Sequence, residues 1–158
     1  NIAVEIRWPD ELDIDVDLWI RAPGDRPVGY SNKSGVIFDL LRDDLGSAND
    51  TLGLNYENAY SRGLPDGEWV VNLHLYNLKS APAPVPVAVQ VSKMTSDGSR
   101  ASVWSGLAIL QRGGDEITVL RFVTDSDDDD RGFGRLVVVL RVQIGVDECL
   151  FEHSRLFA

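Results

Sequence analysis

The sequence has little of the chemistry that most enzymes and zinc sites use. It contains one cysteine, Cys149, and two histidines, His74 and His153. A single cysteine excludes an intramolecular disulfide and a Cys-x-x-Cys zinc site. Two histidines are too few for a His-rich metal site, and the residues around His74 give no sign of a nucleophile paired with a base. We therefore predict that the protein is not an enzyme.

Positive charge is also scarce in this chain. Its 158 residues carry 15 Lys and Arg against 25 Asp and Glu, which gives a formal net charge of -10. Nucleic-acid binding needs clustered basic residues that neutralise phosphates, and docking on an anionic membrane surface needs them as well. This balance argues against both functions, and it favours bound cations or a partner with a basic face.

Long hydrophobic runs are missing too. No stretch approaches the roughly 18 consecutive apolar residues of a membrane-spanning helix, and no signal peptide is recognisable. The chain begins abruptly with NIAVEIRW and without methionine. We expect it to be a processed or truncated piece, so that any membrane attachment would run through an N-terminal helix that precedes it.

What the sequence does have is alternation of apolar and polar residues with period two, which is typical of half-buried β-strands. In LDIDVDLWI, for example, Ile14, Val16 and Leu18 alternate with aspartates. Further runs of this kind are NIAVEIRW, EWVVNLHLYNL, VPVAVQVSKM, ASVWSGLAILQ, EITVLRFVTD and GRLVVVLRVQI. Turn signals rich in Pro, Gly and Asp separate the runs.

This pattern predicts an all-β fold: a single antiparallel β-sandwich, jelly-roll-like, with little or no helix, over residues 1–158. The best helix candidate, residues 36–46, fits a strand equally well. The Pro-rich stretch 80–86 predicts a connection that leads into an edge strand. We expect residues 125–132 to be an acidic, solvated loop, and residues 133–158 to be an extra strand or a divergent C-terminal end.

Three aspartates, Asp13, Asp15 and Asp17, alternate with apolar residues along one predicted strand. Two interpretations stay open: a solvated or arginine-paired face of the strand, and a calcium site. Calcium needs about six to eight oxygen ligands from several segments, so a site requires the loop of residues 42–51 to fold over this face. The candidate metal ligands are Asp13, Asp15, Asp17, Asp43, Asp44, Asn49 and Asp50.

Two tryptophans, Trp19 and Trp69, sit beside polar residues on their predicted strands. Exposed tryptophans on a sheet can stack on sugar rings, although core packing is the commoner role of this side chain. A turn-rich stretch around Asn32 is expected to form a rim at one end of the sandwich. The candidate ligand- or partner-binding residues are therefore Trp19, Trp69, Asn32 and Lys33.

Several motifs follow one another in a recognisable order: DVDLWI (15–20), GYSNKSG (29–35), LLRDDLG (40–46) and the run NYENAYSRGLPDGEWVVNLHLY (55–76). Together they resemble a bacterial family of YfaP-like exported β domains. Members of that family have one predicted N-terminal membrane helix, and their genes often lie beside those of MotA/TolQ/ExbB-type proton-channel proteins. The resemblance implies a fold and a location, and it carries over no catalytic residue.

Residues and resemblance together predict a non-enzymatic exported module of the bacterial periplasm or cell surface, which contacts a protein partner and whose loops calcium orders. The resemblance implies that this partner is an inner-membrane proton-channel-type complex. Two alternatives stay open. One is a carbohydrate-binding module with tryptophan platforms, and the other is a structural subunit of a phage or surface filament, which self-assembles by pairing residues 137–140 at a subunit edge.

Overall fold

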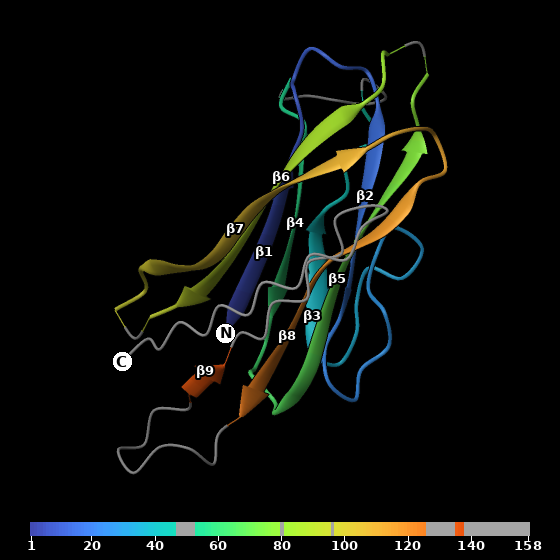
Figure 1. The fold of residues 1–158 in the computed structure, drawn as a ribbon. Coiled ribbons are helices and arrows are strands. Elements are labelled where there is room, and N and C mark those ends of the chain that lie inside the picture. Colours follow the sequence, from blue (N-terminus) through green and yellow to red (C-terminus); the bar gives the residue numbers. More distant parts are fainter. Residues whose placement is uncertain (47–52, 80, 96, 126–134, 138–158) are drawn as a thin grey trace.

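The computed structural model of the chain describes residues 1–46, 53–79, 81–95, 97–125 and 135–137. These residues form nine β-strands and no helix, arranged in two antiparallel sheets (Figure 1). The strand order is β3-β4-β1-β6-β7 in the larger sheet and β2-β5-β8-β9 in the smaller one. The prediction of an all-β fold is confirmed, and two such sheets with a shared apolar core are the layers of a sandwich.

The strands follow the period-two pattern of the sequence. The larger sheet consists of β3 (Phe38–Arg42), β4 (Tyr56–Ser61), β1 (Ile2–Arg7), β6 (Val85–Met94) and β7 (Arg100–Leu110). The smaller sheet consists of β2 (Asp15–Arg21), β5 (Gly67–Asn77), β8 (Glu116–Asp125) and β9 (Arg135–Val137). Every apolar run that the alternation singled out contains a strand. Residues 36–46 contain the strand β3 and no helix.

Two strands differ from the sequence-based expectation. The alternation does not predict β4, because its buried positions are Glu57, Ala59 and Ser61 and not large apolar residues. The expectation of an edge strand after the Pro-rich stretch is wrong, because β6 lies between β1 and β7. Pairing with β1 stops at Ala88, so around Pro86 the strand is paired on one side only and a missing N–H is tolerated.

The core between the sheets includes Trp69, which is buried. Its ring stacks on Phe122 with the ring centroids 5.6 Å apart, and it meets Phe38 edge to face at the same separation. Its indole Nε1 donates a hydrogen bond to the Thr124 hydroxyl at 2.8 Å. This position corrects the expectation that Trp69 is a stacking platform, because a ring enclosed by the core presents no face to a ligand.

The C-terminal part of the described chain is β9, which pairs with β8 through Val137 opposite Val123. Residues 138–158 and the acidic run Asp127 to Asp130 lie outside the described residues. Of the subunit edge predicted at 137–140, only Val137 is therefore described, and it pairs within its own chain. No helix long and apolar enough to cross a membrane occurs in the part of the chain that the structure describes.

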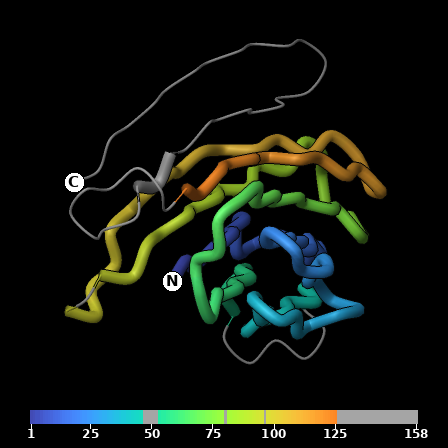
Figure 2. The backbone as a smooth tube through the Cα atoms, turned by 90° about the horizontal axis from the view of Figure 1, so that it is seen from below, coloured from blue at the N-terminus to red at the C-terminus, as the bar shows by residue number. Residues whose placement is uncertain are grey.

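One side of the sandwich matters most for the functional site. There β2, the outermost strand of the smaller sheet, contacts β4 of the larger sheet. In Figure 2, β3 (cyan) lies at the bottom of the view and β8 (orange) lies at the top, so this side of the sandwich is the one remote from β8. We call this side the β2/β4 edge, and it brings the aspartates of β2 toward the segment that follows β3.

Candidate functional site: a buried acidic cluster and an aromatic surface

Five acidic side chains gather at the β2/β4 edge, where the two sheets and the segment after β3 meet. They are Asp15, Asp17, Asp43, Asp44 and Glu57, and we call them the acidic cluster. All are buried except Asp43, which is partly buried. The polar face of β2 is therefore not solvated at Asp15 and Asp17, which differs from the interpretation of these aspartates as an exposed row.

The segment after β3 covers this face because a glycine lets it approach closely. Gly46 has a φ of +67°, and a Cβ atom at this position would lie 2.7 Å from the backbone oxygen of Ile14. Asp44 holds the segment in place, since its carboxylate accepts hydrogen bonds from Gly46 N at 3.0 Å and Tyr56 N at 3.3 Å and an ion pair from Arg42 at 2.8 Å. Asp44 therefore has a structural role at this edge.

Glu57 connects the two sheets at the same edge. Its side chain is fully buried, and its Oε2 accepts a hydrogen bond from Leu18 N of β2 at 2.7 Å. Its Oε1 accepts another from Asp44 N at 3.1 Å. Because β2 is an edge strand of its sheet, no strand among the described residues lies on this side of Leu18 N to accept its hydrogen bond. The carboxylate of Glu57 takes the place of that missing strand.

The sequence-based list of metal ligands omits Glu57. The signal that would have found it lies in NYENAYS, where Glu57 alternates in register with Ala59 and Ser61. Residues at i and i+2 share a face of a strand. A glutamate on the same face as two small residues indicates an inward position with room for other side chains, and the structure shows that these are Asp17 and Asp43.

Basic side chains surround the acidic cluster. Lys33 Nζ lies 2.8 Å from Asp43 Oδ2, so Lys33 pairs with the cluster. His74 Nδ1 lies 3.0 Å from Asp17 Oδ2. The other residue predicted for this rim, Asn32, donates a hydrogen bond from Nδ2 to the backbone oxygen of Pro27 at 2.7 Å, which stabilises its own turn.

The remaining predicted metal ligands lie elsewhere. Asp13 forms an ion pair with Lys79, and its side chain is about half exposed. Asn49 and Asp50 lie outside the described residues. Of the seven predicted ligands, the structure therefore brings together Asp15, Asp17, Asp43 and Asp44, and it adds Glu57.

Two oxygens in the acidic cluster are not satisfied. Asp15 Oδ1 and Asp43 Oδ1 are buried and have no hydrogen-bond partner among the described residues. A buried carboxylate oxygen without a donor or a cation costs free energy, because it has lost the water that solvated it. The negative charge of the cluster is therefore not fully compensated, and either a bound proton or a metal ion can compensate it.

The pKa values of the cluster reflect this environment. Burial raises the pKa of Asp15 to about 6, and the charges of Asp17 and Asp43 act in the same direction. Burial also raises the pKa of Asp17, although the hydrogen bond with His74 opposes the rise. Burial raises the pKa of Glu57 well above its usual range, against the effect of the two N–H donors. Without a cation, the cluster therefore holds on to protons more strongly than free carboxyls do.

In calcium-free buffer, lowering the pH from 7 to 5 is expected to raise the melting temperature by a few degrees. Asp15 has a folded pKa of about 6 and an unfolded value of 3.8, so between these values the folded chain binds more protons. Carboxyls with a lowered pKa, such as Asp97 at about 2 through its bond with the Thr95 hydroxyl, lose stabilisation only at more acid pH. Thermal denaturation followed by circular dichroism measures the effect, and a melting temperature that falls from pH 7 to pH 5 would contradict it.

An aromatic surface lies next to the cluster on the outer face of the smaller sheet. It consists of three residues: Trp19 in β2, Tyr76 in β5, and Tyr30 in the segment between β2 and β3. The centroids of Trp19 and Tyr30 are 5.5 Å apart, and those of Tyr30 and Tyr76 are 6.1 Å apart. Tyr30 is 45% and Tyr76 57% exposed. The His74 ring, which pairs with Asp17 of the cluster, also meets Tyr76 edge to face at 5.9 Å.

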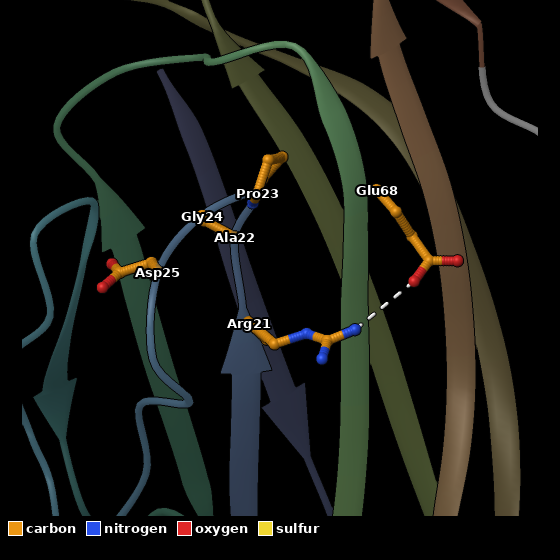
Figure 3. Close-up of a pocket in the computed structure, with 6 residues that line it drawn as sticks. All are labelled: Arg21, Ala22, Pro23, Gly24, Asp25 and Glu68. Atoms are coloured by element: carbon orange, nitrogen blue, oxygen red, sulfur yellow. Dashed lines mark hydrogen bonds and ion pairs between the residues drawn. The ribbon is translucent and has the colours of Figure 1, made fainter.

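A shallow hollow near the far end of β2 is a weaker candidate. It is lined by Arg21, Glu68 and the turn from Ala22 to Asp25 (Figure 3). Figure 3 shows Arg21 reaching toward Glu68, while Asp25 points to the other side of the turn. The carboxylate of Asp25 accepts hydrogen bonds from the backbone N–H groups of residues 26, 36 and 37. The charged side chains that line this hollow, Arg21, Glu68 and Asp25, thus already have partners within the chain.

Comparison of the chain with known protein families, curated proteins and solved structures gives no match. The resemblance to YfaP-like exported domains therefore stays a prediction from the ordered sequence motifs, and the functional argument depends on the acidic cluster and the aromatic surface themselves.

Proposed function

We propose that this domain is a non-enzymatic binding module that contacts a protein partner through the aromatic surface. The observation that carries the proposal is that two tyrosines in contact with each other, Tyr30 and Tyr76, leave about half of their area open to solvent. Tyrosine and tryptophan are enriched in the residues that contribute most to protein–protein binding, because they bury a large area at a small cost in conformational entropy.

The scaffold beneath this surface supports the same proposal. Trp19 packs on Gly29 so closely that a Cβ atom there would overlap the indole ring. The β5 partner of Trp19 is Asn72, and that of Asp17 is His74. Trp19 and Tyr76 thus belong to the paired strands β2 and β5, and Tyr30, in a turn after β2, packs edge to face on Trp19. A surface that is held rigid before binding loses less freedom on association.

The partner's setting is part of the proposal. We infer an exported domain at the periplasmic or outer surface of a bacterium, in contact with an inner-membrane proton-channel-type complex. Two features support it: the ordered motifs that resemble YfaP-like domains, and the net charge of -10, which favours a partner with a basic face.

A protein partner fits this surface better than a sugar chain does. A pyranose ring stacks on an open aromatic face, but one face of the Trp19 ring lies against Gly29. The rings of Tyr30 and Tyr76 are tilted by 48° to each other, so they do not form one flat platform. Trp69, the other platform of the carbohydrate interpretation, is in the core.

Site-specific photocrosslinking in the native host tests the proposed contact surface. A photoreactive phenylalanine analogue at Tyr76 is expected to give one discrete adduct of higher mass with another protein. The same analogue at Leu107 of β7, which is 62% exposed, serves as the matched control and is expected to give at least tenfold less adduct.

Other results of this experiment would contradict the proposal. Equal or absent adducts at the two positions would remove the aromatic surface as the binding site. A homodimeric adduct at Leu107, with a large species in light scattering, would favour the structural-subunit alternative. A change in tryptophan fluorescence on adding cell-wall polysaccharide, lost in Tyr76→Ser, would favour the carbohydrate alternative.

A further inference from the structure

We propose that the acidic cluster binds one calcium ion, with Asp17 of β2, Asp43 of the segment after β3 and Glu57 of β4 as its protein ligands and Asp15 beside them. None of these ligands belongs to the aromatic surface, which lies beside the site. It draws its ligands from both sheets of the sandwich.

The spacing of the three ligands suits a calcium ion. One oxygen from each of Asp17, Asp43 and Glu57 lies within 4.8 Å of the others. Calcium–oxygen distances are about 2.3–2.6 Å, so two oxygens on opposite sides of one ion are separated by about 4.6–5.2 Å. The three carboxylates therefore already stand at the separations that shared coordination of one ion requires.

The unsatisfied oxygens are an independent reason to place a cation here. Asp15 is only 8% exposed, its Oδ1 has no hydrogen-bond partner in the described part of the chain, and the charges of Asp17 and Asp43 raise its pKa. Asp43 Oδ1 is buried without a partner as well. Two buried carboxylate oxygens that lack donors, within one acidic cluster, mark a position where positive charge is missing.

The basic side chains nearby do not balance the cluster. Among the described residues, Lys33 pairs with Asp43 and Arg42 with Asp44. Asp15, Asp17 and Glu57 have no Lys or Arg ion pair in that same part of the chain, and His74 is charged only when protonated. A divalent ion supplies the missing charge at one point, which these side chains do not reach.

Protons are the competing explanation, and Glu57 argues against them as the whole answer. Both of its oxygens accept backbone N–H bonds, from Leu18 and from Asp44. Two N–H donors favour the ionised form of a carboxyl, while burial disfavours it. A cation resolves this conflict, because it compensates the burial of the charge and leaves both hydrogen bonds in place.

The donor set selects the kind of metal. All the ligands are oxygens, which suit calcium or magnesium and not zinc or copper. The imidazole nitrogen beside the cluster, His74 Nδ1, is engaged with Asp17. Magnesium demands a near-ideal octahedron, whereas calcium accepts irregular arrangements of carboxylates from separate segments. Three ligands that come from β2, β4 and a loop segment form an arrangement of the second kind.

Calcium titration of the purified domain, residues 1–158, tests the inference. After treatment with chelator, isothermal titration with calcium chloride is expected to show one saturable site, with a Kd of about 1 mM or tighter. The melting temperature is expected to rise by roughly 5–15 °C at a calcium concentration about 100 times Kd, and to return when chelator is added.

Two variants with opposite expected effects identify the site. Asp43→Asn replaces a carboxylate ligand by a neutral amide and is expected to weaken calcium binding by at least about tenfold, because a formal charge is lost and only one side-chain oxygen remains. Lys33→Gln removes the cation that competes for Asp43 and is expected to tighten binding. Glu68→Gln, in an exposed ion pair on the outer face, is the matched control and is expected to bind as the unmodified domain does.

Several outcomes would overturn the inference. One is a folded domain that shows neither heat nor a melting shift with calcium at concentrations on the order of 10 mM, well above the range of extracellular calcium modules. Another is unchanged binding in both Asp43→Asn and Lys33→Gln, which would place the ion elsewhere. A response to magnesium equal to that to calcium would remove the assignment to calcium. Each of these results leaves the aromatic contact surface untouched.

Discussion

Trp69→Ala is expected to lower the free energy of unfolding by about 3–5 kcal/mol, a loss typical of a large aromatic side chain removed from a core. The ring is stacked on Phe122 and meets Phe38 edge to face, so both neighbours lose their contacts. The Thr124 hydroxyl also loses the indole N–H that donates to it. Denaturant unfolding followed by far-ultraviolet circular dichroism measures the loss without depending on tryptophan fluorescence.

A second tryptophan on the same sandwich provides the control. Trp104 of β7 is only partly buried, and its ring lies over Gly106 near the outer edge of the larger sheet. Trp104→Ala is therefore expected to cost less than half as much as Trp69→Ala. Equal losses in the two variants would show that Trp69 does not anchor the core in the way the structure indicates.

The burial of Trp69 can be predicted from the sequence, because it follows from the alternation of apolar and polar residues along β5. Trp69 has the same parity as Val71, Leu73 and Leu75, which are all buried. The polar neighbours of Trp69 suggested a surface role, but in a regular strand the immediate neighbours face the opposite side. Residues at i+2 and i+4 decide the face, and here they place the tryptophan inside.

The alternation located most strands because β1, β2, β5, β6 and β8 each bury one apolar face. It failed at β4, whose inward residues are Glu57, Ala59 and Ser61. Their burial depends on what lies opposite, and this information is not local to the strand. A strand whose inner face is small and acidic has no apolar period to detect, so its existence is visible only once the sheets have been assembled.

The acidic cluster was predictable only in part, for a related reason. The sequence shows both the row of aspartates and the acidic loop of residues 42–51, and a calcium site requires that this loop fold over the aspartates. Whether Asp15 and Asp17 stay solvated depends on Gly46, whose positive φ lets the segment after β3 reach Ile14. A close backbone approach of this kind joins residues about thirty positions apart, and no periodicity in the sequence encodes it.

Glu57→Ala is expected to lower the free energy of unfolding by about 2–5 kcal/mol in calcium-free buffer, because two buried N–H groups lose their only described acceptor. The removal of a buried charge near Asp17 and Asp43 offsets part of this loss. Glu68→Ala, in an exposed ion pair, is the control and is expected to change stability by less than about 1 kcal/mol. Denaturant unfolding curves of the three proteins make the comparison.

Glu57→Gln separates the structural role of this carboxylate from its proposed role as a ligand. The amide keeps the volume and one acceptor oxygen, but its NH2 group faces one of the two donors, Leu18 N or Asp44 N. We expect a stability loss of about 1–3 kcal/mol without calcium, and a melting temperature that rises much less on calcium addition than that of the unmodified domain. A normal calcium response in this variant would mean that Glu57 only joins the two sheets, and that the ion is held by the aspartates alone.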